Sequence, residues 1–138
     1  MKLSLTKLYR FSASHRLHTP EFSEAENQRL YGKCNNPFGH GHNYVVEVTV
    51  TGPVDPQTGM IANLGELDPF VEREVVEVYD QKYLNEEVPE FRKNVPTTEN
   101  VAREIYRRLK AFPAARLERV RIQETSNNSF EYDGSDEP

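Results

Sequence analysis

The chain has 138 residues, 36% of them hydrophobic and 28% charged, and its formal net charge is −5. This size suits one domain with one core, so we expect residues 1–138 to form a single unit. The acidic balance and the lack of a long basic stripe argue against nucleic acid as a partner, and no apolar run approaches the ~20 residues that would cross a membrane.

The first expected element is a strand that ends near His15, because apolar residues from Leu3 onward fall mostly on one parity. Residues 18–37 are polar and irregular, which predicts a long loop or a short helix. A loop of that length in a compact domain usually has a functional role. A second strand is expected from about His40 to Thr51, where valines alternate with other residues.

Two amphipathic helices are predicted next. Apolar residues recur at helical spacing from Leu64 to Val78, and again from Val101 to Phe112. Thr97 or Thr98 can cap the free amides at the start of the second helix, and Pro113 is expected to end it.

A third strand over about 117–123 and a short strand over 129–132 complete the expected order, ββααββ. This order predicts an α+β domain in which a four-stranded antiparallel sheet carries two helices on one face. Both edges of that sheet invite pairing with another copy of the chain, so we expect a larger homo-oligomer. The acidic tail, about residues 133–138, is expected to be frayed.

Three of the four histidines are placed so that they can converge. His40 and His42 stand two residues apart on one strand and so share a face, and His15 lies near the end of the strand expected to pair with it. Three imidazoles from two strands form the protein half of an open zinc site, with a fourth position left for water or substrate. The plainer alternative is a pair of surface histidines on a turn, and His18 is expected at the surface.

Cys34 is the only cysteine, so an internal disulfide is excluded and the expected compartment is the reducing cytoplasm. The first fifteen residues lack the apolar segment of a secretory signal, which agrees with that compartment. Cys34 is a candidate nucleophile or general base, because a nearby Zn²⁺ would lower its pKa. A small buried thiol and a fourth zinc ligand are the alternatives.

Two carboxylates complete the list of candidates. Glu124 ends the third expected strand, where a carboxylate can accept two hydrogen bonds from a planar heterocycle with adjacent N–H groups. An exposed glutamate at a strand end is the commoner explanation. Asp80, taken alone, is a polar residue after the first helix.

Four segments now carry a family resemblance: FSASHRL, CNNPFGHGHNY, PTTENV and ETSNN, in this order over nearly the whole chain. Together they resemble the 6-pyruvoyl-tetrahydropterin synthase family. Five residues separate Cys34 from the HGH motif. That gap is similar to the biopterin-pathway type, whereas the related queuosine-pathway carboxytetrahydropterin synthase usually has a shorter one.

The resemblance implies the tunnelling fold, in which trimers close their sheets into a barrel and two trimers stack into a hexamer with active sites between subunits. It implies a lyase of tetrahydrobiopterin biosynthesis that converts 7,8-dihydroneopterin triphosphate to 6-pyruvoyl-tetrahydropterin and triphosphate. Zinc is the implied cofactor, and Mg²⁺ commonly accompanies the triphosphate.

The resemblance also implies roles for individual residues. Cys34 matches the catalytic cysteine and Glu124 the glutamate that anchors the pterin, while Thr97 and Thr98 lie in the matching pterin-pocket segment. The positions that match the zinc ligands are His15, His40 and His42.

The pair Asp80-Gln81 departs from the family pattern, in which Asp-His completes a Cys–Asp–His proton relay. The amide of Gln81 cannot titrate near neutral pH. The sequence therefore leaves open a synthase slowed by Gln81, in which Cys34 works with Asp80 and water. It also leaves open a relative with another outcome, such as 6-carboxytetrahydropterin synthesis or dihydropterin side-chain cleavage, and a non-catalytic pterin-binding oligomer.

Overall fold

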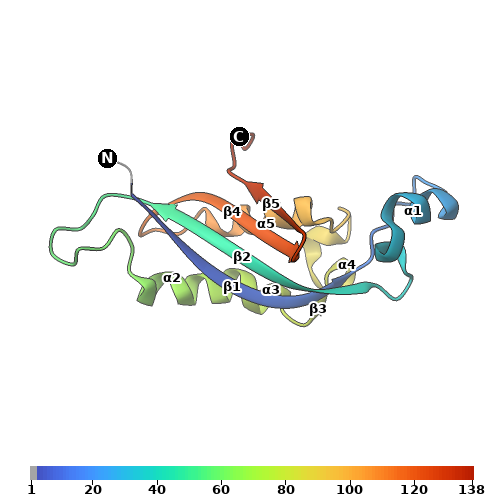
Figure 1. Ribbon diagram of the computed structural model, residues 1–138, viewed down its shortest axis with the longest axis horizontal. Coiled ribbons are helices and arrows are strands. Elements are labelled where there is room, and N and C mark those ends of the chain that lie inside the picture. The colour runs from blue at the N-terminus through green and yellow to red at the C-terminus, as the bar shows by residue number, and fades with distance from the viewer. Residues whose placement is uncertain (1–2) are drawn as a thin grey trace.

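A computed structural model describes residues 3–138, which form one long twisted sheet with helices along one face (Figure 1). The sheet has five strands in the order β3-β1-β2-β4-β5. Their bounds are β1 Ser4–His15, β2 His40–Thr51, β3 Lys82–Tyr83, β4 Arg116–Thr125 and β5 Asn128–Tyr132.

The predicted α+β class is confirmed, but the prediction of a four-stranded antiparallel sheet is wrong. Strands β1, β2, β4 and β5 pair antiparallel as expected, whereas β3 adds a fifth strand parallel to β1. Strand β3 has only two residues, which is too short to show an alternating pattern. Backbone hydrogen bonds hold β3 against β1, beginning with the N–H of Gln81, which donates to the carbonyl of Ser12 at 2.6 Å.

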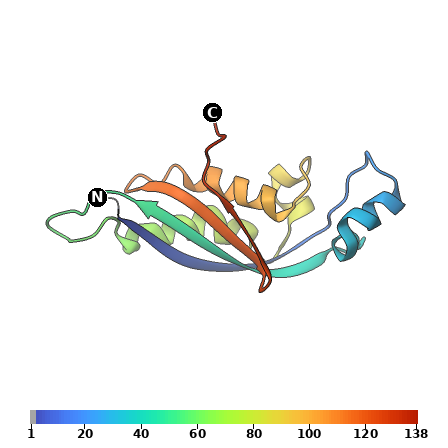
Figure 2. The same ribbon diagram turned by 45° about the horizontal axis from the view of Figure 1, so that its top comes forward.

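The two predicted amphipathic helices are present and lie on the same face of the sheet (Figures 1 and 2). The first is continuous from Leu64 to Tyr79 and contains a π-helical turn. Its parts are α2 Leu64–Val71, the π turn η2 Glu72–Val76 and α3 Glu77–Tyr79. The second, α5 Thr98–Leu109, is capped by Thr97, whose side chain accepts from the N–H of Asn100. Two short helices that the sequence pattern did not predict lie between them, α4 Leu84–Glu87 and the 3₁₀ turn η3 Pro89–Phe91.

The segment between β1 and β2 extends beyond the end of the sheet (Figure 1). It contains α1 Glu24–Tyr31 and the 3₁₀ turn η1 Gly32–Asn35, so the expected loop or short helix is confirmed. Ser23 and Glu26 form a capping box at the start of α1. At the base of the segment, the N–H of Leu17 donates to the carbonyl of Cys34 at 2.7 Å, which brings the cysteine back to the end of β1.

The core lies between the sheet and the long helices. On β1, Phe11, Ala13 and His15 share the face that packs against the helices, and on β2 Tyr44 and Val46 do the same. The strand register places His15 directly opposite His40. Two histidine-bearing strand ends therefore meet at one end of the core. Among the described residues, no helix has the length and apolar character needed to cross a bilayer.

Candidate active site

His15 is completely buried, and both of its ring nitrogens have defined surroundings. Nδ1 lies 2.8 Å from the carbonyl oxygen of Pro96. Because a carbonyl can only accept, Nδ1 carries the proton, and the lone pair of Nε2 is directed away from Pro96. Burial lowers the pKa of His15, although the bond to Pro96 opposes that effect. The side chain is therefore a neutral imidazole whose Nε2 lone pair is free to bind a metal.

The Nε2 atom of His15 faces a second imidazole. His15 Nε2 and His42 Nε2 are 3.1 Å apart. Two nitrogens bound to one tetrahedral zinc at about 2.0–2.1 Å would lie roughly 3.3 Å from each other. Burial also lowers the pKa of His42, with the negative charge of Glu124 opposing it. Two neutral nitrogens are thus held at nearly the separation that a shared metal requires.

Cys34 is the third member of this cluster. Its Sγ lies 4.0 Å from His42 Nε2, and one ligand atom from each of His15, Cys34 and His42 lies within 4.8 Å of the others. Nitrogen and sulfur donors are the set that zinc prefers. Burial raises the pKa of Cys34, and the nearby negative charge of Glu124 raises it further. Without a cation beside it, Cys34 is therefore a thiol at neutral pH.

His40 lies beside the cluster. Its ring centroid is 4.8 Å from that of His42, with the two rings nearly perpendicular. The sequence predicted His40, together with His15 and His42, as the nitrogen ligands, whereas the cluster with converging ligand atoms contains Cys34 as its third member. His18 is farther along the chain, where its Nδ1 lies 3.4 Å from the amide nitrogen of Asn35.

Glu124 lies next to the histidines and is held by two neighbours. Its Oε2 accepts a hydrogen bond from the hydroxyl of Thr98 and lies 3.9 Å from His42 Nε2. Its Oε1 lies 3.4 Å from the side-chain nitrogen of Asn128. Each carboxylate oxygen can accept about two bonds, so one acceptor position on each oxygen is left for a ligand. This arrangement suits the planar donor that the sequence suggested for Glu124.

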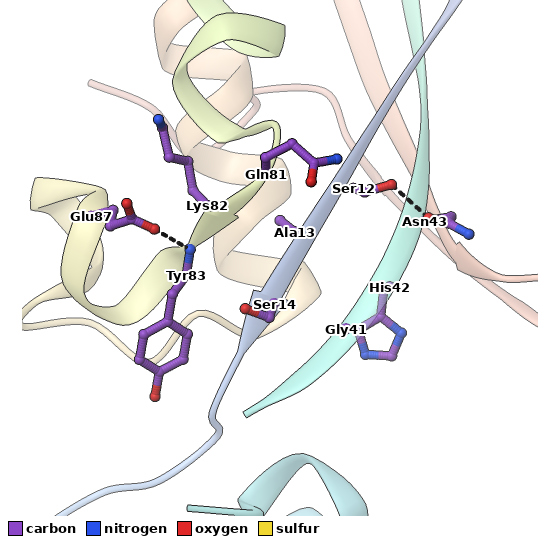
Figure 3. A pocket seen from close by; sticks show the side chains of 10 residues that line it. All are labelled: Ser12, Ala13, Ser14, Gly41, His42, Asn43, Gln81, Lys82, Tyr83 and Glu87. Carbon is purple, nitrogen blue, oxygen red and sulfur yellow. Dashed lines mark hydrogen bonds between the residues drawn. The ribbon is translucent and has the colours of Figure 1, made fainter. Parts of the chain in front are cut away.

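Asp80 and Gln81 lie at the opposite edge of the sheet. Asp80 Oδ1 accepts from the N–H of Ser12 at 2.8 Å, and the N–H of Gln81 donates to the carbonyl of the same residue. Figure 3 shows Gln81 and His42 on opposite sides of the strand that carries Ser12. Gln81 has φ 60°, a left-handed conformation that is uncommon outside glycine. Within one chain, strand β1 thus lies between Gln81 and the metal cluster.

A hollow of about 470 Å³ lies around this edge and includes Ser12, His42, Asn43 and Gln81 in its lining (Figure 3). The zinc-ligand candidate His42 and the relay position Gln81 both border it, whereas Cys34 and Asp80 are not among its lining residues. Its walls are about equally polar and apolar. The hollow is open, and a partner that filled it would approach both Gln81 and the strand that carries His42.

Sequence reasoning missed two contributors to the site. The carbonyl of Pro96 orients His15, and a backbone acceptor has no side-chain signature in a sequence. The side chain of Asn128 is the second contributor. Its side-chain oxygen accepts from the N–H and the hydroxyl of Thr125, which directs its nitrogen toward Glu124.

Comparisons with known proteins agree with the family resemblance and with the fold. A family model described as 6-pyruvoyl tetrahydropterin synthase matches residues 4–135. A human protein named 6-pyruvoyl tetrahydrobiopterin synthase is 50% identical over 125 residues, covering 90% of this chain and 86% of the human one. A protein of the same name from Poecilia reticulata is 48% identical over 131 residues, covering 94% and 89%.

Comparison of the backbone fold with solved structures leads to the same family. The structure of Caenorhabditis elegans 6-pyruvoyl tetrahydropterin synthase matches with a TM-score of 0.92 at 40% sequence identity, covering 98% of this chain and 97% of that one. Both kinds of likeness therefore extend over nearly the whole chain.

Proposed function

The chain belongs to the 6-pyruvoyl tetrahydropterin synthase family, a family of lyases acting on phosphates, and on that basis we propose that it converts 7,8-dihydroneopterin triphosphate to 6-pyruvoyl-tetrahydropterin and triphosphate. The observation that carries the proposal is the closeness of Glu124 to the histidine cluster. Glu124 Oε2 is 3.9 Å from His42 Nε2, so a ring held by Glu124 would place its side chain beside the metal-binding nitrogens.

We propose Zn²⁺ as the metal. The two facing nitrogens of His15 and His42 support this, as does the soft sulfur of Cys34 nearby. In the arrangement we favour, His40 supplies the third nitrogen and Cys34 remains free for proton transfer. In the alternative, Cys34 is itself a ligand. When bound, the ion would polarise side-chain oxygens of the substrate and place a positive charge beside the thiol.

The residues of this chain have separate roles in the proposal. Glu124 binds the pterin ring through its two free acceptor positions, and Thr98 and Asn128 keep the carboxylate in place. Thr97 caps the helix that carries Thr98. Cys34, as a thiolate, accepts a proton from the substrate side chain and returns it to a neighbouring carbon. This proton transfer and the loss of the triphosphate need no external redox cofactor. Mg²⁺ would accompany the triphosphate.

We further propose that Asp80 and Gln81 act on the Cys34 of a neighbouring copy, because strand β1 separates them from the Cys34 of their own chain. The exposed backbone edges of β5 and of the first part of β1 can pair with other copies, which supports the tunnelling-fold trimer and its pairing into a hexamer. Gln81 cannot exchange protons as an imidazole does, so Asp80 and water would complete the transfer.

The test is incubation of the purified, zinc-loaded protein with 7,8-dihydroneopterin triphosphate, with triphosphate and pterin products measured separately. Release of triphosphate with formation of 6-pyruvoyl-tetrahydropterin supports the proposal. Formation of 6-carboxytetrahydropterin or of a pterin without its side chain would instead assign one of the alternative outcomes. Tight pterin binding without any turnover would identify a non-catalytic pterin-binding protein.

A further inference from the structure

One short segment contacts both functional groups of the site. The carbonyl of Pro96 accepts from Nδ1 of His15 at 2.8 Å, and the hydroxyl of Thr98, two residues later, donates to Glu124. His15 comes from β1 and Glu124 from β4, and the two strands are not neighbours in the sheet. The segment Val95–Thr98, which leads into the first residue of α5, therefore orients the metal-binding histidine and the ring-binding glutamate at the same time.

Asn100 braces this segment on both sides of Pro96. Its side-chain nitrogen donates to the carbonyl of Val95 at 2.8 Å, and its backbone N–H donates to the hydroxyl of Thr97 at 3.2 Å. The N–H of Thr97 also donates to the carbonyl of Val95 at 2.8 Å. Pro96 is buried between these bonds, and its ring restricts φ. The orientation of the Pro96 carbonyl is thus fixed by Asn100 together with Thr97.

We propose that Asn100 is a positioning residue that sets the separation between the metal centre and the pterin-binding carboxylate. The inference rests on the proposed function, because it assumes one ligand that reaches both groups. The ligand class is a bicyclic heterocycle with adjacent N–H donors that carries a side chain with oxygen atoms. Such a ligand is sensitive to small displacements, since a misplacement of about 1 Å in a reacting geometry can cost roughly 10²-fold in rate.

The inference predicts that removing the Asn100 side chain weakens zinc binding and pterin binding together. Without the side chain of Asn100, the Val95–Thr98 segment loses the bond to the Val95 carbonyl, so His15 and Glu124 both become less well oriented. Partners outside the metal ligands typically change metal affinity about 10–100-fold. We expect Asn100→Ala to weaken zinc binding about tenfold and to raise the Kd of 7,8-dihydroneopterin by a similar factor. The Kd of 7,8-dihydropterin, which has no side chain, should rise less because it depends on Glu124 alone.

Three variants separate positioning from general destabilisation. Asn100→Asp keeps the size of the side chain but removes the donor, so it should behave like Asn100→Ala. Asn94→Ala removes an exposed asparagine from the same stretch of chain and should change neither affinity. Ala102→Gly lowers the stability of α5 in its buried interior without touching the segment, so it should lower Tm and leave both affinities unchanged at a temperature where all variants are folded.

The experiment measures zinc affinity by competition with a chelator and pterin affinity by fluorescence titration, on the full-length protein. A parallel loss of both affinities in the two Asn100 variants, absent from Asn94→Ala and Ala102→Gly, supports the inference. Loss of only one affinity, of neither, or of both in Ala102→Gly as well overturns it. Wild-type protein that binds neither zinc nor 7,8-dihydroneopterin would overturn the proposed function itself, which is a separate result read before any variant is compared.

Discussion

His15 Nε2 and His42 Nε2 face each other at 3.1 Å, while the opposite nitrogen of His15 is bound to the carbonyl of Pro96. The hydrogen bond to Pro96 therefore leaves only Nε2 of His15 available to bind a metal. The pair is a preformed two-nitrogen site at the end of the core, and the remaining ligand choice lies between His40 and Cys34.

Removal of His42 should abolish metal binding. His42→Ala deletes one of the two facing nitrogens, and we expect near-total loss of zinc by elemental analysis of the purified protein. His18→Ala is the matched control, because His18 lies outside the cluster, and it should retain one zinc per chain. Full zinc content in His42→Ala would show that the metal centre is elsewhere.

Cys34→Ala decides between the two roles of the thiol. If Cys34 is a base, the variant should keep its zinc and lose turnover. Loss of zinc together with turnover would instead make Cys34 a ligand.

Glu124→Gln should weaken pterin binding with little change in fold. The amide keeps the shape of the side chain but replaces one acceptor oxygen with a donor, which opposes an N–H group of the ring. We expect a loss of about 2–3 kcal/mol of binding free energy, measured by fluorescence titration with 7,8-dihydroneopterin. The exposed Glu99 of α5 offers a control, since Glu99→Gln removes a charge away from the site. Equal pterin affinity in Glu124→Gln and wild type would mean that another group binds the ring.

Gln81→His should raise turnover. An imidazole there could accept and return protons, and one acid–base group typically contributes ~10²–10⁴-fold in rate. The backbone permits the change, because histidine is among the non-glycine residues enriched at positive φ and Gln81 has φ 60°. Zinc content should not change. The double variant Gln81→His/Cys34→Ala should lose the gain, and a fast wild type with a neutral or harmful Gln81→His would show that Asp80 or water already performs the transfer.

The carboxylate of Asp68 should make stability depend on pH. It accepts from the hydroxyl of Tyr9 at 2.6 Å and from Lys7 at 3.3 Å, and the bond from Tyr9 is the main cause that lowers the pKa of Asp68. A lowered carboxylate pKa stabilises the fold above the ordinary pKa of aspartate, and this contribution is lost as the pH falls through the lowered value. The group is partly exposed, so the effect should stay within about 1 kcal/mol.

Asp68→Asn tests this in urea unfolding at several pH values. The variant should be less stable than wild type near pH 6, and the difference should shrink as the pH approaches 2. A difference that is constant with pH would show that Asp68 acts through packing or neutral hydrogen bonds instead.

Side-chain patterns predicted the elements that bury a regular face. The parity of β1 predicted that His15 would end a strand, and the capping preference of threonine predicted the start of α5 at Thr97 or Thr98. Strand β3 could not be predicted, because its two residues join the sheet through backbone groups next to Ser12. For the same reason the bond from His15 to Pro96 was not foreseen: a carbonyl oxygen is present at every position in a chain.

The candidate site was predicted in composition more than in arrangement. The sequence predicted His15, His40 and His42 as the nitrogen ligands, with Cys34 as a nearby base or a fourth ligand. The structure instead places ligand atoms of His15, Cys34 and His42 within 4.8 Å of one another. The relation of Asp80 and Gln81 to Cys34 depends on which side of β1 each residue lies. That is a property of the three-dimensional sheet order, which local spacing does not encode.

The π turn in the first long helix has a consequence for how the chain tolerates changes in length. The buried residues Leu67, Val71, Val75 and Tyr79 recur every four positions, which in a regular α-helix would rotate the buried face by about 40° at each step. The wider turn at Glu72–Val76 absorbs this drift by accommodating an extra residue. Deleting one exposed residue there, such as Glu72 or Arg73, would restore α geometry and leave Asp80 at the sheet edge. The same deletion within α5 would turn every following residue of that helix by about 100°. Loss of one codon is thus tolerable in one helix of this fold and disruptive in the other.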